Sequence, residues 1–142
     1  MTSSRILKHW AIDKAGRKWN TKPERQFNAY QESRGMGLVQ NVCLPFGSWT
    51  FQLDFVHPID VDWRESIVGL TYDVNYEVDG NHYHGSDIQH GKDMWKDDMK
   101  NRQGLKVIHV PAILTERKWW SYLDAQLPKA LLSPSPTVYV IA

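Results

Sequence analysis

The sequence predicts an α/β domain in which a small mixed sheet is flanked by helices. Three observations indicate this class: a well-capped helix at residues 21–35, a strictly alternating strand at 72–79, and a short apolar strand at 105–111 that follows a second helix. A chain of 142 residues fits one domain. We divide it into a basic arm (1–20), a core (21–132) and a tail (133–142).

The first half of the core predicts one helix and two strands. Thr21 is a good N-cap, Pro23 lies in the first turn and Gly35 ends the helix. Residues 41–56 indicate a short strand, a turn and a longer strand. In the longer strand one face is apolar and the other polar, with Trp49, Phe51, Leu53 and Phe55 on the first and Thr50, Gln52 and Asp54 on the second.

The second half alternates strands with helices. Residues 72–79 place apolar side chains on one face (Tyr72, Val74, Tyr76, Val78) and polar ones on the other (Asp73, Asn75, Glu77, Asp79). Residues 86–104 predict a helix with Met94, Trp95 and Met99 on its inner side. A buried strand at 105–111 follows, and then a helix at 115–132 that we expect to break near Pro128. The tail has some strand character.

Composition sets limits on compartment and class. The lone Cys43 excludes an internal disulfide and favours a reducing compartment. No apolar run approaches the roughly 20 residues of a membrane span, and no segment is typical of a signal peptide. We therefore expect a cytoplasmic protein with no membrane partner.

The net charge is only +1, but the charges are segregated. Basic residues predominate in residues 1–25 and again between 92 and 106, on both sides of an acidic centre. Such flanks suit a polyanion held over a bound metal, although on charge alone two solvated faces are the favoured explanation.

Carboxylates on two predicted strands are the main candidates for chemistry. Asp54 lies on the polar face of one strand, and Glu77 and Asp79 on that of the other. If the strands pair there, like charges meet, which is costly without a cation. Oxygen ligands at this density suit Mg²⁺ or Mn²⁺. The alternative is a polar face that simply contacts water.

Several motifs occur in an order that resembles a known family: "LDF" at Asp54, "YEVDG" ending at Gly80, His-x-His at 82–84, "KDD" at 96–98 and "GLKVIHV" at 104–110. Together they resemble the PD-(D/E)XK nuclease superfamily, and more closely its very-short-patch-repair-like branch, which includes phage homing endonucleases. The resemblance implies a restriction-endonuclease-like core and metal-dependent endonucleolytic cleavage of DNA. It also implies a site at the sheet edge and a phage or mobile-element origin.

The resemblance also implies roles for individual residues. Asp54 and Glu77 match metal ligands, and Asp79 stands where many relatives carry lysine. His82 or His84 then becomes the candidate general base or acid, with His82 slightly favoured by its spacing from Asp79.

Other assignments stay open. Glu24 matches a helix-borne Glu that positions metal-bound water, but it also completes a capping box with Thr21. The family's final Asp is Asp87, Asp93 or Asp97, although a solvated helix face suits Asp97 and Lys96 better. Candidate phosphate contacts are Arg17, Lys18, Lys22, Lys96 and Lys100.

Other functions compete with this interpretation. A zinc site formed by His82, His84 and His90 is an alternative, but no second cysteine is present to support one. His109 is expected to be a hydrogen-bonded core residue. Alternatives to a DNA endonuclease are a non-catalytic nucleic-acid-binding module with a decayed nuclease fold, and an RNA-directed nuclease. A homodimer or a partner protein is also compatible with the small size of the chain.

Overall fold

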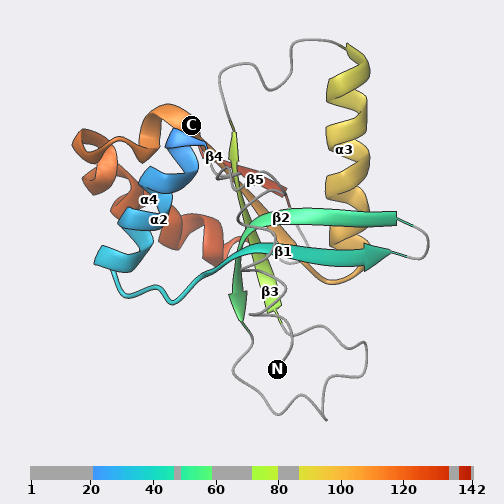
Figure 1. Cartoon of the computed structure of the whole chain (residues 1–142), viewed down its shortest axis with the longest axis horizontal. Helices are drawn as coiled ribbons and strands as arrows, with labels where there is room; N and C mark the ends of the chain where they lie inside the picture. The colour runs from blue at the N-terminus through green and yellow to red at the C-terminus, as the bar shows by residue number, and fades with distance from the viewer. Residues whose placement is uncertain (1–20, 47–48, 59–71, 80–86, 135–137, 142) are drawn as a thin grey trace, which may run out of the picture.

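The computed structural model describes residues 21–46, 49–58, 72–79, 87–134 and 138–141 (Figure 1). The elements in chain order are α2 (Lys22–Ser33), β1 (Val39–Phe46), β2 (Trp49–Pro58), β3 (Tyr72–Asp79), α3 (Asp87–Arg102), β4 (Lys106–Pro111), two short 3₁₀ helices (Ala112–Thr115 and Arg117–Trp119), α4 (Trp120–Leu132) and β5 (Val138–Val140). The predicted helix and strand order of the core is confirmed. The predicted basic arm lies outside the described residues.

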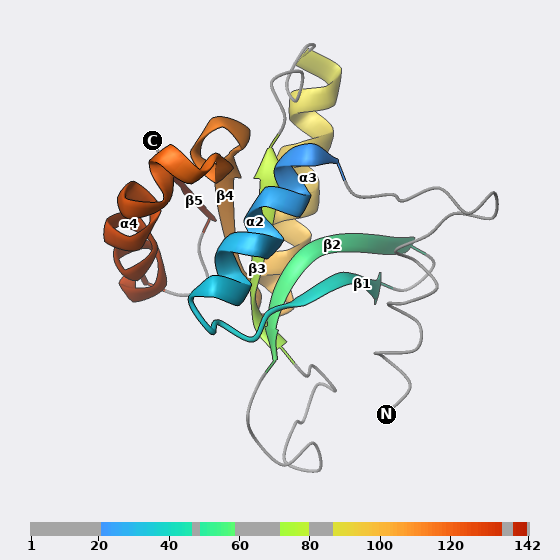
Figure 2. The same cartoon turned by 60° about the vertical axis from the view of Figure 1, so that its left-hand side comes forward.

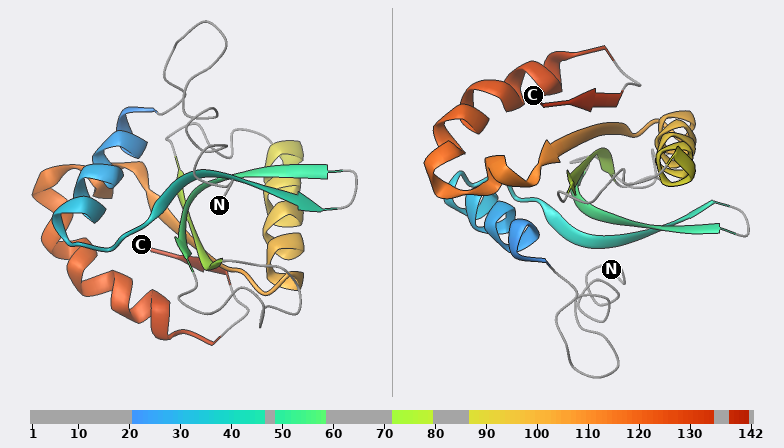
Figure 3. Two further views of the ribbon diagram at one scale, coloured as in Figure 1. Left: turned by 60° about the horizontal axis from the view of Figure 1, so that its bottom comes forward. Right: turned by 90° about the horizontal axis from the view of Figure 1, so that it is seen from above.

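The described strands form one mixed sheet in the order β1-β2-β3-β4-β5. The pairs β1–β2 and β2–β3 are antiparallel, whereas the pairs β3–β4 and β4–β5 are parallel. Helices α2 and α4 lie on one side of the sheet and α3 on the other (Figures 1 and 3). The predicted α/β class is therefore confirmed, and the tail contributes the fifth strand. Within the described residues, no helix has both the length and the apolar character needed to cross a membrane.

Helix α2 begins and ends where the sequence predicts. The Thr21 hydroxyl accepts a hydrogen bond from the Glu24 main-chain N–H at 3.4 Å, and the Thr21 N–H donates to Glu24 Oε1 at 2.9 Å. Gly35 has a φ of +63°, which ends the helix in a conformation that glycine adopts without strain. Phe27 packs edge-on against Phe55 of β2, so α2 lies over the sheet (Figure 2).

The core consists of two clusters of buried apolar side chains. The larger fills the space between α2, α4 and the sheet and includes Phe27, Tyr30, Phe55, Val74, Tyr76, Val78, Ile108, Val110, Leu123 and Leu127. The smaller contains Val42, Phe51, Leu53, Val56 and Leu105, with Met99 of α3 against it. The apolar face predicted for residues 72–79 is confirmed by Val74, Tyr76 and Val78.

The β1–β2 hairpin changes face at one point. The pairing of the two strands skips Asn41 and Asp54, and Asn41 has a φ of 57°. Leu53 and Val56 pack into the smaller cluster although they are three residues apart, whereas Phe55 packs into the larger. Regular alternation would place Leu53 and Phe55 on the same face of the strand. The prediction of one continuous apolar face is therefore wrong, because the hairpin twists sharply at Asp54.

The inner side of α3 also differs from the prediction. Met94 and Trp95 are 60% and 41% exposed, while Lys100 is only 3% exposed. Of the three predicted inner residues, Met99 packs against the smaller cluster and Trp95 contacts Phe51 of that cluster edge-on at 5.5 Å, although much of the Trp95 side chain is exposed. The helix instead places charged side chains against the sheet, because that sheet face is itself polar.

Helix α4 continues through Pro128 rather than breaking there. Proline removes one hydrogen bond from the helix, at a cost of about 3 kcal/mol. Leu123, Leu127 and Ala130 are buried on the same helix and hold both sides of the proline against the sheet. Packing therefore overrides the local break that the sequence predicts.

Candidate functional site

Asp54 and Glu77 lie side by side where β2 and β3 separate. The last regular pair of the two strands is Phe55 with Tyr76. Beyond it, side chains take the place of main-chain acceptors. The Asp54 N–H donates to Glu77 Oε2 at 2.8 Å, and the Val78 N–H donates to Asp54 Oδ2 at 2.9 Å. The structure thus brings together the two carboxylates that the sequence proposes as metal ligands.

Two pockets meet at these carboxylates. The larger, about 440 Å³, is lined by Thr21, Pro23, Glu24, Asp54, Glu77, Val78 and Asp79. The smaller, about 280 Å³, is lined by Glu24, Asn41, Gln52 and Asp54. Glu24 and Asp54 border both pockets, so the start of α2 and the twist of β2 form a shared wall. All four acidic residues proposed from α2, β2 and β3 therefore line one pocket.

The electrostatics at Asp54 disfavour negative charge. Burial, together with the charges of Glu77 and Glu24, raises the pKa of Asp54 well above its usual value. The N–H of Val78 and the ammonium of Lys100 act in the opposite direction but do not cancel this effect. A cation bound in this pocket would relieve the repulsion among the carboxylates.

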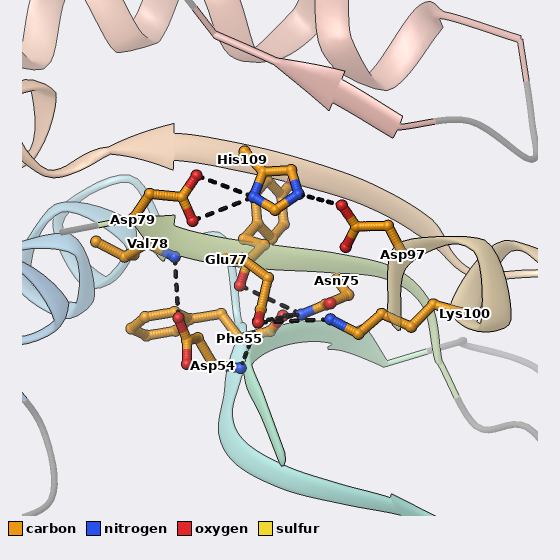
Figure 4. Close-up of polar contacts among 10 residues, drawn as sticks. Asp54, Phe55, Asn75, Glu77, Val78, Asp79, Asp97, Lys100 and His109 are labelled. Carbon is orange, nitrogen blue, oxygen red and sulfur yellow. Dashed lines mark hydrogen bonds and ion pairs between the residues drawn. The ribbon is translucent and has the colours of Figure 1, made fainter. Parts of the chain in front are cut away.

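Lys100 supplies a buried positive charge to Glu77. Its ammonium lies 3.4 Å from Glu77 Oε1, and the Asn75 amide donates to Glu77 Oε2 at 3.0 Å (Figure 4). The prediction for Lys100 was a phosphate contact, but the side chain is 3% exposed and directed at a carboxylate. Lys96, by contrast, is exposed as expected. Lys100 of α3 therefore acts as a buried counter-charge for Glu77.

His109 of β4 joins Asp79 to Asp97 of α3. Its Nδ1 lies 3.0 Å from Asp79 Oδ2, and its Nε2 lies 2.7 Å from Asp97 Oδ2 (Figure 4). Burial alone lowers the pKa of His109, but hydrogen bonds and charges from Asp79 and Asp97 raise it to about 10. The imidazole is consequently a cation at neutral pH and donates an N–H to each carboxylate.

This bridge is the part of the site that sequence reasoning missed. His109 was expected to be hydrogen-bonded in the core, and that part is confirmed. Its partners were not foreseen, and Asp97 of α3 faces the sheet rather than solvent, with 14% of its side chain exposed. The available signal was a polar residue inside an apolar strand, which must find partners when it is buried.

Glu24 has both of the roles that the sequence allows. Its Oε1 accepts hydrogen bonds from the N–H and hydroxyl of Thr21, so it completes a capping box. It also lines the two pockets beside Asp54. Lys22, one residue after the N-cap, is exposed and available to a polyanion.

Several proposed residues lie outside the described residues. Their positions relative to Asp54 are therefore not described. These are Arg17, Lys18, His82 and His84; the side chains of Asp87, His90 and Asp93 in α3 also belong to this group.

The donor set fits a magnesium site that is only partly formed by protein. In the described part of the chain, no group of three or more His, Cys, Asp or Glu side chains is arranged to hold a metal ion. Mg²⁺ usually takes one or two carboxylates and completes its shell with waters and substrate phosphate. Asp54 and Glu77, on adjacent strands in one pocket, meet that smaller requirement.

Comparison of the chain with protein-family models, curated proteins and solved structures finds no significant match.

Proposed function

We propose that this protein is a divalent-metal-dependent endonuclease that hydrolyses DNA phosphodiester bonds on a restriction-endonuclease-like core. One observation carries the proposal: Asp54 and Glu77 are joined by a 2.8 Å hydrogen bond and line a pocket together with Glu24 and Asp79. The motif order "LDF", "YEVDG" and "GLKVIHV" supports it independently.

Asp54 and Glu77 would hold Mg²⁺ or Mn²⁺. When bound there, such an ion lowers the pKa of a coordinated water and stabilises charge on a phosphoryl oxygen. Asp79 lines the same pocket and is a third candidate ligand, but His109 already binds its carboxylate. Glu24 borders the pocket from α2, where a carboxylate can orient an attacking water by accepting its proton.

The cations assigned to the site divide into two kinds. Lys100 and His109 are buried, and each binds a carboxylate of the site, so they fix its geometry. Lys22 and Lys96 are exposed, and we assign them to the phosphate backbone. Arg17 and Lys18 would extend that surface, and His82 or His84 would assist proton transfer.

The test is cleavage of supercoiled plasmid and branched DNA with Mg²⁺, Mn²⁺ or EDTA. Asp54→Asn and Glu77→Gln should each reduce the rate by at least about 100-fold, as expected when a group that stabilises transition-state charge is lost. Asp98→Asn is the matched control, because Asp98 is a carboxylate of α3 that is 56% exposed and pairs with Arg102. Equal rates for all four proteins under every condition would contradict the proposal.

A second function is favoured by one observation. Lys100 already neutralises part of the carboxylate cluster, so the carboxylates have a counter-charge without a bound metal. A decayed, non-catalytic DNA-binding module would need such an internal cation. That alternative predicts DNA binding that EDTA does not change and no cleavage with any ion. Substituting RNA in the same assay distinguishes an RNA-directed nuclease.

A further inference from the structure

We infer that the smaller pocket binds a neutral hydrogen-bond donor carried by the nucleotide next to the scissile phosphate. The pocket is about 280 Å³ and is lined by Glu24, Asn41, Gln52 and Asp54. The inference rests on the proposed function, because it names the part of the substrate that this second pocket receives.

The lining of the pocket is rich in acceptors. Gln52 donates its Nε2 to Asn41 Oδ1 at 3.3 Å, which leaves the Gln52 carbonyl oxygen at the opposite end of the amide. Glu24 uses Oε1 for the Thr21 cap and carries a second oxygen, Oε2. Asp54 adds a further carboxylate. Such a lining repels a phosphate and suits an N–H or O–H donor.

The position of the pocket ties its occupant to the reaction centre. Glu24 and Asp54 line both pockets, so a group in the smaller one lies directly beside a group in the larger one. Its volume of about 280 Å³ falls just below the range of roughly 300–1,000 Å³ typical of drug-sized ligands. One base or one sugar therefore fits better than a dinucleotide.

The backbone of Asn41 shapes one wall of this pocket. Asn41 is 1% exposed and has a φ of 57° in the middle of β1, where no turn requires it. Asparagine adopts this left-handed conformation more readily than most non-glycine residues. Here the conformation accompanies the skipped pair with Asp54 and places the Asn41 amide against Gln52, two residues before Asp54.

Two sources supply the donor chemistry: an exocyclic amino group of a base, or the 2′-hydroxyl of a ribose. Both can be tested by fluorescence anisotropy with short labelled oligonucleotides in EDTA, where no cleavage occurs. In the first pair of ligands, the amino groups of the bases are removed: adenine is replaced by purine, and guanine by hypoxanthine. The other pair replaces deoxyribose by ribose.

The variants separate the side chain from the backbone. Gln52→Ala removes the carbonyl acceptor, and Asn41→Gly keeps the positive φ but removes the amide that holds Gln52. Gln103→Ala, an exposed glutamine at the end of α3, is the control. We expect wild type and Gln103→Ala to prefer the donor-bearing ligand of one pair by about 10-fold, and both pocket variants to lose that preference.

The outcomes distinguish this inference from the proposed function. Loss of preference in the amino pair assigns the pocket to a base, and loss in the sugar pair assigns it to a ribose. Cleavage that depends on Asp54, with no effect of Gln52→Ala on either preference, overturns this inference alone. Discrimination that depends on Gln52, without cleavage under any condition, overturns the nuclease activity alone.

Discussion

The main-chain N–H of Asp54 donates a hydrogen bond to the carboxylate of Glu77 at 2.8 Å. The two acidic residues are thus held at the point where β2 and β3 separate, rather than being free to turn apart. Burial and the neighbouring carboxylates make the charged form of Asp54 unfavourable in the folded protein.

Asp54→Asn should therefore stabilise the metal-free protein. The folded-state pKa of Asp54 is raised, so its contribution to stability is greatest below its unfolded pKa and is lost as pH rises through the folded value. Asparagine removes the charge and keeps an acceptor for the Val78 N–H. Urea unfolding in EDTA at neutral pH should show a gain of about 1 kcal/mol. A loss of stability would show that the carboxylate is not under repulsion.

Variants at Glu24 separate its two roles. Glutamine also completes a capping box, so Glu24→Gln should leave the melting temperature near that of wild type, whereas Glu24→Ala should cost about 1 kcal/mol. If Glu24 orients the attacking water, Glu24→Gln loses most of the cleavage rate despite its intact helix. A glutamine variant with full activity would assign Glu24 to the cap alone.

Lys100→Met should be strongly destabilising. It leaves Glu77 partly buried without its cation, and breaking such a pair costs about 3–5 kcal/mol. The double variant with Glu77→Gln should recover more than half of that loss in urea unfolding, because no uncompensated charge remains. Lys118→Met is the control, since the Lys118 side chain is 72% exposed. A double variant no more stable than Lys100→Met would exclude the charge explanation.

The raised pKa of His109 predicts that the folded protein loses stability as the pH becomes alkaline. Its folded pKa of about 10 lies above the usual 6.5, so its contribution is fully present below pH 6.5 and is lost as pH rises towards 10. Thermal melts between these two values should show this decline for wild type, and His109→Gln should lack the decline while being less stable at pH 7. His57→Gln is the control, because burial lowers the pKa of His57 and moves its effect to acid pH. An equal decline in both variants would contradict the assignment to His109.

Local patterns predicted most of the fold. The capping signals around α2, the alternation of β3 and the apolar run of β4 are properties of neighbouring residues, and the structure confirms each. Asp54 and Glu77 were also identifiable, because alternation assigned both to polar faces of strands that pair.

The remaining features depend on tertiary packing. Asparagine tolerates a positive φ, but the apolar strand pattern of "QNVCL" does not predict one at Asn41, where the face change of the hairpin occurs. The inner side of α3 was predicted from hydrophobicity, whereas Asp97 and Lys100 face the sheet because Glu77 and His109 need partners of opposite charge. Such pairings become visible only when distant elements are brought together.

The contacts of α3 with the sheet bear on where the helix sits along its own axis. Asp97 and Lys100 are spaced three residues apart, and each meets a partner of opposite charge on the sheet. The sequence repeats the same spacing one turn earlier, with Asp93 and Lys96. A translation of the helix by one turn, about 5.4 Å, would therefore present an identical order of charges to the same partners.

Electrostatics alone thus cannot choose between the two alignments of α3. The difference lies in the apolar residues between the charges: Met99 packs against the smaller core cluster, and Trp95, one turn earlier, contacts Phe51 of the same cluster edge-on at 5.5 Å. A shift by one turn would bring the much larger Trp95 to the place of Met99, so these two apolar contacts distinguish the observed alignment from the shifted one.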